Sequence, residues 1–291
     1  TYSYTVPSGV TSIKVEAWGA GGGGYFAQAG GGGAYARTDS VTVSPGSSYT
    51  VVVGAGGGPD AYGGDSYFNN TSTVMAKGGN KGSASGAGGR ASESVGLSVK
   101  YSGGYGGEDT SYDSYGGGGG AAGPNGDGVA GQKGPDPNYT GGNGGAGNNG
   151  SGGAGGTGGY YTNGGNGVSH SLGGGGGAGA GGGGTTYSGG DGGSPGGGGG
   201  SSDYSDINNY GTGGDGQVKI TYTVTVPAQI FKVKDGSTEV FRVSNYVGVL
   251  NTNPSVALDV TGSIEYTGTI TDVSDMRLKE NITEITGVNA L

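Results

Sequence analysis

Tyrosine side chains set among short polar residues are the groups in this chain best suited to bind another molecule. They occur in islands between glycine tracts, at residues 108–115, 133–140, 160–172 and 201–210. A tyrosine ring offers a rigid face for stacking, and neighbouring Asn, Asp and Ser side chains offer hydrogen bonds, which is the chemistry of adaptable recognition. Sugar rings suit such a surface. The candidate binding residues are Tyr112, Tyr115, Tyr139, Tyr160, Tyr161, Tyr204 and Tyr210.

Residues for catalysis or metal binding are scarce. The single histidine, His170, and the absence of cysteine argue against a catalytic triad, a histidine metal centre and disulfides. Asp109, Asp113 and Asp191 could bind a hard cation, but no loop has calcium-type spacing, and we expect solvated loop acids. Glycoside hydrolysis needs paired carboxylates on a rigid groove, whereas the acids here lie mainly in glycine-flanked loops. We therefore predict no cofactor, no metal and no enzyme acting on an external substrate.

Charge and hydropathy exclude two classes of partner. Only 12% of the residues are charged and the formal net charge is −9, so the basic surface that binds nucleic acid is absent. No apolar run approaches the roughly 20 residues of a membrane span. The first residues lack the basic and apolar regions of a signal peptide. A chain without cysteine is also compatible with folding in a reducing cytoplasm.

Glycine accounts for 81 of the 291 residues, against about 7% in ordinary proteins. Collagen is excluded, because its strict repeat also needs abundant proline and the chain has 9. A flexible linker is the plain alternative. We favour polyproline-II-type glycine helices, which pack closely and exchange backbone hydrogen bonds. A three-residue register is visible at Gly141, Gly144, Gly147, Gly150, Gly153, Gly156 and Gly159.

Alternating β-formers flank the glycine-rich body and predict the strands that clamp its ends. On the N-terminal side the pattern covers residues 2–6, 13–17, 41–43 and 49–53, and its distant counterpart is residues 218–224. The predicted fold is mainly β: an antiparallel sheet or sandwich with an inserted polyglycine-II-like helical lattice, followed by an intertwined trimeric β stem. The tyrosine islands should collect at the ends of the lattice, where they either bind a ligand or merely shield the ends from water.

Glycine almost disappears after residue 220, which predicts a domain boundary near residues 225–227. The glycine-rich β domain is assigned to residues 1–225, with the polyglycine-rich insert at 101–216. Residues 226–273 contain a hairpin around the Asp235-Gly236 turn. This stretch has too few apolar residues for a core of its own, so we expect three chains to intertwine their strands as a homotrimeric stem.

The run VGVLNTNPSVALDVTGSI (247–264), followed by SDMRLKEN (274–281), resembles the junction of stem and C-terminal chaperone in trimeric bacteriophage tail fibres and tailspikes. The chaperone of that family is of the endosialidase type. The resemblance implies trimerisation and one self-cleavage before the serine, with Ser274 as nucleophile, Lys279 as base and Val273–Ser274 as the bond cut. Only the start of the chaperone is expected, at 274–291. The alternative is a plain helix start with Ser274 as its N-cap.

The runs SGVTSIKVEAWGAGGGG (8–24), SSYTVVVGAGGG (47–58) and GGDGQVKITY (213–222) resemble a glycine-rich domain of phage and bacterial surface proteins. Together the two resemblances imply a phage tail fibre that attaches the virion to its host. Its partners would be its own copies, other tail proteins and a bacterial surface glycan or outer-membrane component. It would fold in the host cytoplasm, join the virion and be extracellular after release. The alternative is a structural spacer or decoration of a virion or cell-surface appendage, without a receptor site.

Overall fold

The computed structural model divides the chain into two compact units, Thr1–Pro227 and Ala228–Leu291. The residues that the structure describes are 1–108, 114–135, 141–151, 153, 155–156, 162–177, 187–202, 207–224, 234–235 and 238–239.

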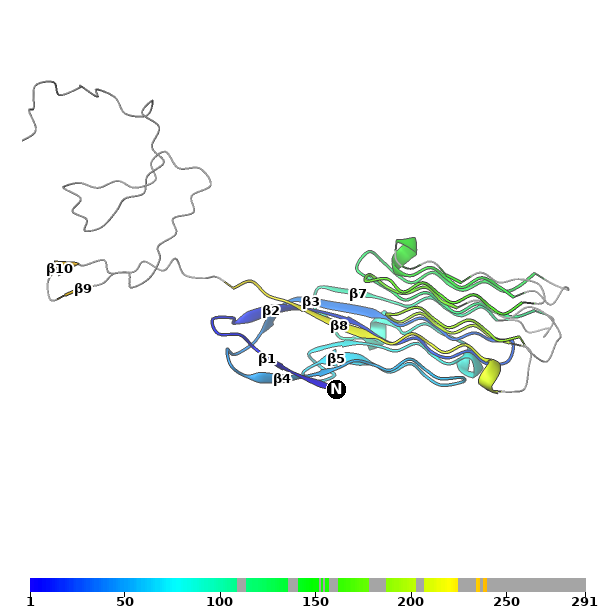
Figure 1. Cartoon of the computed structure of the whole chain (residues 1–291), viewed down its shortest axis with the longest axis horizontal. Helices are drawn as coiled ribbons and strands as arrows, with labels where there is room; N and C mark the ends of the chain where they lie inside the picture. Colours follow the sequence, from blue (N-terminus) through cyan, green and yellow to red (C-terminus); the bar gives the residue numbers. More distant parts are fainter. Residues whose placement is uncertain are drawn as a thin grey trace, which may run out of the picture. The chain divides into compact units, whose positions relative to one another are not determined.

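The first unit begins as a β-sandwich of two four-stranded antiparallel sheets (Figure 1). One sheet has the order β1-β4-β5-β6 and the other has the order β7-β3-β2-β8. The strands are β1 (Tyr2–Thr5), β2 (Ser12–Trp18), β3 (Tyr35–Thr42), β4 (Ser48–Val52), β5 (Ser66–Phe68), β6 (Val74–Ala76), β7 (Val99–Tyr101) and β8 (Gln217–Thr221).

The core of the sandwich follows from residue alternation. On β2, Ile13, Val15 and Ala17 point inward and are 1%, 0% and 0% exposed. They pack with Phe68 of β5 and Val74 of β6 in one apolar cluster. The alternating runs at 2–6, 13–17, 49–53 and 218–224 therefore mark real strands. The prediction of a mainly β fold with antiparallel sheets is confirmed.

Strands β5, β6 and β7 carry no alternation long enough to be recognised in the sequence, because each has only 3 residues. Their pairing depends on partners distant in sequence. Phe68 of β5, for example, faces Val51 of β4 and Val74 of β6 across the sheet. Tertiary packing fixes such strands where local pattern does not.

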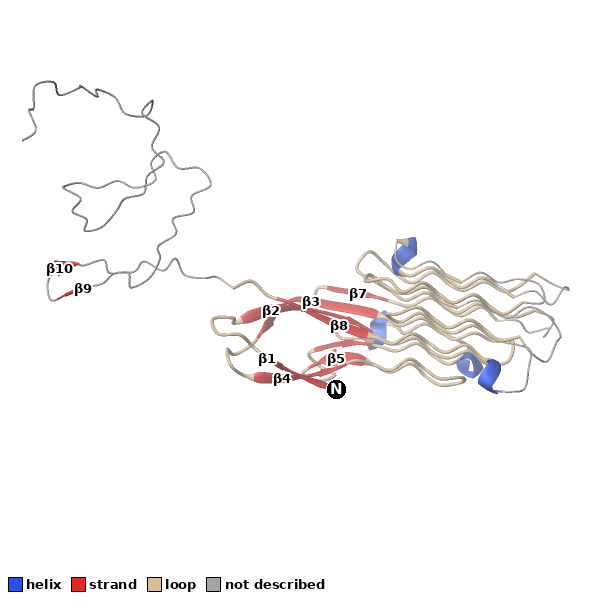
Figure 2. Cartoon of the chain, viewed as in Figure 1, coloured by secondary structure: helices blue, strands red, loops and turns tan. Residues whose placement is uncertain are grey.

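Beyond the sandwich the chain continues as a bundle of extended glycine runs that lie side by side (Figure 2). Residues 29–34 show how the runs are bonded. Their backbone N–H groups donate at 2.7–3.1 Å, and residues three apart donate to the same neighbouring run. The donor–acceptor pairs are Ala29–Gly107, Gly30–Gly199, Gly31–Asn80, Gly32–Gly104, Gly33–Gly196 and Ala34–Lys77.

The carbonyl groups of the same run face three further neighbours. The carbonyls of Gly30 and Gly33 accept hydrogen bonds from the N–H groups of residues 119 and 122. Those of Gly31 and Ala34 accept from residues 22 and 19, and that of Gly32 accepts from residue 89. Residues 117–122 repeat the scheme with N–H donors at 2.7–3.0 Å. A period of three with six bonded neighbours is the pattern of packed polyproline-II-type helices made of glycine. The glycine-rich body is therefore an ordered lattice.

Glycine is required in this lattice because neighbouring backbones touch where a side chain would stand. A Cβ added at Gly32 would overlap the carbonyl oxygen of Gly120, and one added at Gly118 would overlap that of Gly198. By contrast, a Cβ at Gly58 would meet nothing within 4 Å. The requirement belongs to the inner positions and not to every glycine.

Two details of the lattice differ from the sequence prediction. Residues 19–34, 54–64 and 77–90 contribute runs of their own, so the lattice extends beyond residues 101–216. The three-residue glycine register from Gly141 is interrupted by the 3₁₀ turn η3 (Asn148–Gly150), where Gly150 has a φ of +82°. The other short helical turns are η1 (Gly82–Ala84), η2 (Ala91–Glu93) and η4 (Ile207–Asn209).

Trp18 joins the sandwich to the lattice. It ends β2, is 1% exposed, and packs with Tyr35 at a ring-centroid distance of 4.9 Å. Ala122 of the lattice belongs to the same apolar cluster. The Trp18 Nε1–H also donates to the carbonyl of Leu172 at 3.2 Å.

In the second unit the structure describes β9 (Lys234–Asp235) and β10 (Thr238–Glu239), which pair antiparallel. This pairing agrees with the predicted hairpin around the Asp235-Gly236 turn. The rest of the predicted stem (226–273) and chaperone segment (274–291) lies outside the described residues.

Candidate functional site

Two of the four tyrosine islands contact the turn formed by residues 25–28, and a third adjoins the end of the first island. Gln28 pairs with Glu108 at the start of the first island, and Phe26 pairs with Ser202 of the fourth. Gly141, which follows the second island, pairs with Tyr115. The turn itself is closed by the Tyr25 N–H, which donates to the Gln28 carbonyl at 2.7 Å. We call this end of the lattice, away from the strands, the distal end.

Tyr25 is the central aromatic residue of the distal end. Its ring lies 5.6 Å from that of Tyr210 at an angle of 59°. Tyr210 is 6% exposed and Tyr25 is 37% exposed, so the buried ring supports the open one. Ring pairs of this geometry are worth about 0.5–1.5 kcal/mol beyond the area they bury.

A second aromatic group lies beside Tyr25. The Lys81 Nζ lies 5.7 Å from the centroid of the Tyr62 ring and 3.3 Å from Asp60 Oδ2. Tyr62 is 58% exposed. The ion pair fixes the lysine over the ring, and a cation above a tyrosine face is itself attractive.

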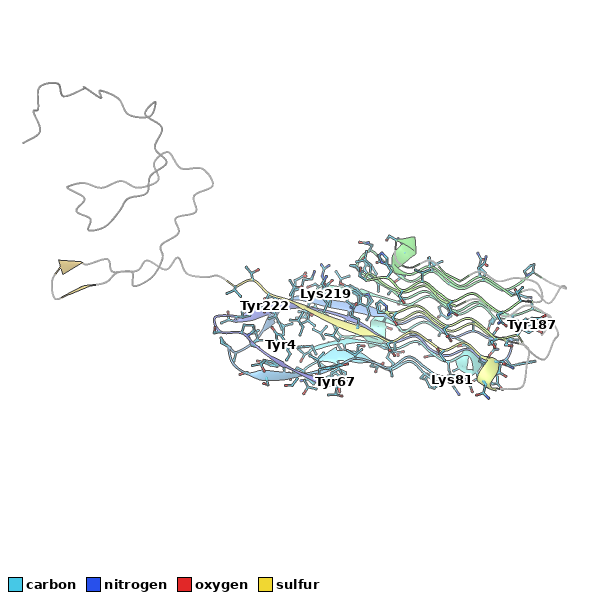
Figure 3. The ribbon with its side chains drawn as sticks, in the orientation of Figure 1. Tyr4, Tyr67, Lys81, Tyr187, Lys219 and Tyr222 are labelled. Carbon is cyan, nitrogen blue, oxygen red and sulfur yellow. The ribbon has the colours of Figure 1, made fainter. Side chains whose placement is uncertain are left out.

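Backbone contacts make these groups one surface. The Asp60 N–H donates to the carbonyl of Gly24, next to Tyr25, at 2.8 Å. Gly82, next to Lys81, is so close to Tyr25 that a Cβ there would press on the tyrosine Cβ. We name Tyr25, Asp60, Tyr62, Lys81 and Tyr210 the distal platform. Figure 3 shows Lys81, and also Tyr187, at the end of the lattice away from the strands.

Two predicted binding tyrosines lie among the described residues, and both are buried. Tyr115 is 2% exposed and its carbonyl accepts from the Gly142 N–H at 2.7 Å. The buried ring of Tyr210 packs against the ring of Tyr25. Their rings belong to the packing of the distal end rather than to its open surface. The other predicted residues, Tyr112, Tyr139, Tyr160, Tyr161, Tyr204, Ser274 and Lys279, lie outside the described residues.

Sequence reasoning missed Tyr25 and Tyr62, although both carry the signal used for the islands. Tyr25 stands between the glycine tracts 21–24 and 30–33, and Tyr62 follows the Pro59-Asp60 turn between glycines. Both precede residue 101, and so lie before the segment predicted to form the lattice.

The third island is not a loop over most of its length. Residues 163–169 form a lattice run along residues 188–194. On this run the Asn166 Oδ1 accepts from the Asp191 N–H at 2.9 Å. Asp191 in turn accepts at Oδ1 from the N–H and Oγ1–H of Thr212, at 2.8 and 2.9 Å. Asp191 is exposed, as expected of a solvated acid, but it lies on a lattice run and its carboxylate also caps a neighbouring run.

His170 lines an open cavity of about 320 Å³ where the lattice meets the sandwich. Ser169, Ser171, Ser194 and Gln217 also line it. The His170 Nδ1 accepts from the Leu172 N–H at 3.2 Å, and the Ser169 Oγ accepts from the Ser194 N–H at 3.0 Å. These contacts hold turns of the backbone in place.

Neither a metal centre nor a membrane span is found among the described residues. No group of three or more His, Cys, Asp or Glu side chains there is arranged to hold a metal ion. No helix in those same ranges has the length and apolar character of a membrane span.

Comparison with known proteins identifies the larger unit. No curated protein matches the chain. Residues 1–223, which include both sheets and the lattice, match a family described as a glycine-rich domain. The chain therefore belongs to this glycine-rich domain family.

Proposed function

We propose that this chain is a receptor-binding tail-fibre protein of a bacteriophage, and that the distal end of its lattice contacts the bacterial surface. The observation that carries the proposal is the distal platform. There, a lattice whose inner positions exclude side chains carries two exposed tyrosines and a fixed Lys81–Asp60 pair. A rigid scaffold that displays aromatic and polar groups on turns is the usual design of a recognition surface.

The ligand class follows from the same groups. Tyr25 and Tyr62 offer ring faces to the apolar side of a sugar, while Lys81 and Asp60 offer a donor and an acceptor to its hydroxyls. The net charge of −9 disfavours a strongly anionic partner. A surface glycan therefore fits, and an outer-membrane component with exposed aromatic and polar loops is the second form of the receptor.

Homotrimerisation through residues 226–273 is part of the proposal. It rests on the resemblance of residues 247–264 to tail-fibre stems. Three weak sites on one fibre would hold a cell far more firmly than one, because the second and third contacts form at high effective concentration.

A binding test separates this function from a structural role. Labelled full-length chain is applied to a panel of bacteria that differ in surface glycans, and bound label is measured by flow cytometry. Tyr25→Ala and Tyr62→Ala should each weaken binding by about 5- to 30-fold, as for interface residues worth about 1–2 kcal/mol. Tyr67→Ala, on β5 of the sandwich, is the matched control. If wild type binds none of the cells, or the platform variants bind as well as wild type, a spacer without a receptor site is the better account.

Self-cleavage at the Val273–Ser274 bond is a separate part of the proposal and rests on the resemblance of residues 274–281 alone. Ser274 would attack the peptide carbonyl with Lys279 as the base, which requires the lysine to be neutral and hence shielded from water. Mass spectrometry of wild type and of Ser274→Ala tests it. An uncut wild-type chain contradicts this part only.

A further inference from the structure

The β-sandwich has one sealed lateral side. There, residues 94–98 link the edge strands of the two sheets. Met75 of β6 and Val95 exchange two backbone hydrogen bonds of 2.8 Å. The Ser98 N–H donates to the Arg37 carbonyl at 3.0 Å, and the Leu97 N–H donates to Thr38 Oγ1 at 3.0 Å. β7 follows this bridge directly.

The opposite lateral side is open. Within the described residues, β8 pairs with β2 alone and β1 pairs with β4 alone. Both edges face the same side, since β8 contacts β5, and only β4 lies between β5 and β1. Burial raises the pKa of Tyr4 on β1, and the nearby Tyr222, just after β8, raises it further. Figure 3 labels Tyr4 on β1 and Tyr222 just after β8.

Apolar side chains that should face a core are uncovered along this side. Tyr2 and Tyr4 share one face of β1; Tyr4 packs against Phe68 at a ring-centroid distance of 6.3 Å, yet Tyr2 is 67% exposed. On β8, Val218 and Ile220 pack against the core but are only partly buried. Tyr222 and Val224 continue this row and are 41% and 48% exposed.

The open edges also lack the usual protection. Proteins guard free strands with charges, prolines or bulges, but β1 (YSYT) has no charge and β8 (QVKIT) has only Lys219. The Tyr4 hydroxyl is buried and has no hydrogen-bond partner among the described residues. An added strand would cover Tyr2 and Tyr222.

We propose that this open side is the contact between copies of the glycine-rich domain, in which β8 of one copy pairs with β1 of the next. The inference rests on the homotrimer of the proposed function. The two strands are different, so the contact is heterologous, and three such contacts close around a threefold axis without leaving a free edge. The chain also runs directly from β8 into the stretch proposed to trimerise, so the copies converge beside this edge.

Cross-linking between isotope-labelled copies tests the pairing. Full-length Ser3→Lys chains, light and ¹⁵N-labelled, are mixed before assembly and treated with a short amine-reactive cross-linker. Linked peptides of β1 and β8 are then identified by mass spectrometry. Links between Lys219 and position 3 that join a light and a heavy chain are expected. The control is Leu97→Lys, whose side chain replaces one that is 86% exposed on the sealed side; it should give no such link to Lys219.

Amide exchange of the unmodified chain gives a second reading. Consecutive amides of β1 and β8 should exchange as slowly as those of the central strand β2. The pairing is overturned if links form only within single chains, or if either edge is linked to residues after Val224. Rapid exchange of every second amide on both edges would also overturn it. A trimer that fails these tests but still binds cells leaves the proposed function intact. A monomeric chain that binds cells overturns both the trimer and this pairing, but not receptor binding.

Discussion

At the scale of single residues, the molecule separates glycines that the lattice requires from glycines that it merely tolerates. Gly32 lies in a run with bonded neighbours on all sides, and a Cβ added there would overlap the Gly120 carbonyl oxygen. Gly58 faces open space. The amino-acid composition does not distinguish these two glycines. Backbone packing distinguishes them.

Gly32→Ala should therefore destabilise the first unit while Gly58→Ala should not. An inserted methyl group in a packed interior costs about 1–3 kcal/mol, and at Gly32 it must also separate two bonded backbones. Gly58→Ala should be neutral or slightly stabilising, since alanine restricts the unfolded chain by about 0.4–1 kcal/mol. Urea unfolding followed by Trp18 fluorescence measures both. Equal stability of the two variants would contradict the packed lattice.

The buried Tyr35–Glu16 pair predicts a pH dependence. The Tyr35 hydroxyl donates to Glu16 Oε1 at 2.7 Å, and both residues are at most 5% exposed. Burial, and then the hydrogen bond to Glu16, raise the pKa of Tyr35. The unfolded chain releases this proton near pH 10 and the folded chain releases it at higher pH. The contribution to stability is therefore complete below about pH 10 and is lost as the pH rises above it.

Tyr35→Phe isolates this contribution. At neutral pH it should lower the free energy of unfolding by about 1–3 kcal/mol, because Glu16 Oε1 loses its donor inside the protein. Above about pH 10 the gap between wild type and variant should narrow, by at most about 1.4 kcal/mol per pH unit. A gap that stays constant or widens from pH 9 to 11 would contradict the assignment.

At the scale of elements, polar side chains take over the role of backbone at the rim of the lattice. Three side-chain oxygens accept hydrogen bonds from backbone N–H groups of the neighbouring run. They are Asn163 Oδ1 from residue 188 at 2.9 Å, Asn166 Oδ1 from residue 191 at 2.9 Å, and Ser169 Oγ from residue 194 at 3.0 Å. Between these contacts, the N–H groups of residues 164, 167 and 170 donate to the carbonyls of the same three residues. Both sets repeat every three residues, so the side chains continue the helical register.

Asn166→Ala should open this rim locally without unfolding the unit. The Asp191 N–H would lose its acceptor and turn to water, a change of about 0.5–1.5 kcal/mol. Its amide exchange should accelerate by about 2- to 12-fold, the equivalent of that free energy. The amides of the inner run 117–120 should be unaffected and serve as the internal reference. Unchanged exchange at Asp191 would show that the bond does not persist in solution.

Prediction from sequence succeeded where a residue pattern has a period and failed where only three-dimensional neighbours decide. The alternation in β2 and β8 located both strands, although nearly 200 residues separate them in the chain. β6 could not be predicted because its three residues form a strand only through pairing with Phe68 and Val95. Tyr115 directly precedes a glycine tract and Tyr25 directly follows one. Only the fold decides that the first is buried and the second is open.

At the scale of the first unit, the lattice runs lead directly into the strands. β2 passes at Trp18 into the run 19–24, and β8 follows the run 211–216. Trp18, the single tryptophan, is buried at this junction between Tyr35 and Ala122. Since the same chain segments build both parts, we expect the sandwich and the lattice to unfold as one cooperative unit.

Phe68→Ala tests this coupling from the sandwich. Phe68 is fully buried in the core, stacks on Tyr49 at 5.3 Å, and belongs to no lattice run. Its truncation should cost about 3–5 kcal/mol. If the unit is cooperative, the amides of Gly118, Gly119 and Gly120 should exchange faster by the equivalent of that free energy, although none of them touches the substituted residue. The surface substitution Leu97→Ala provides the control. Lattice amides that keep their protection while those of β2 and β5 lose it would show instead that the glycine helices stand on their own backbone hydrogen bonds.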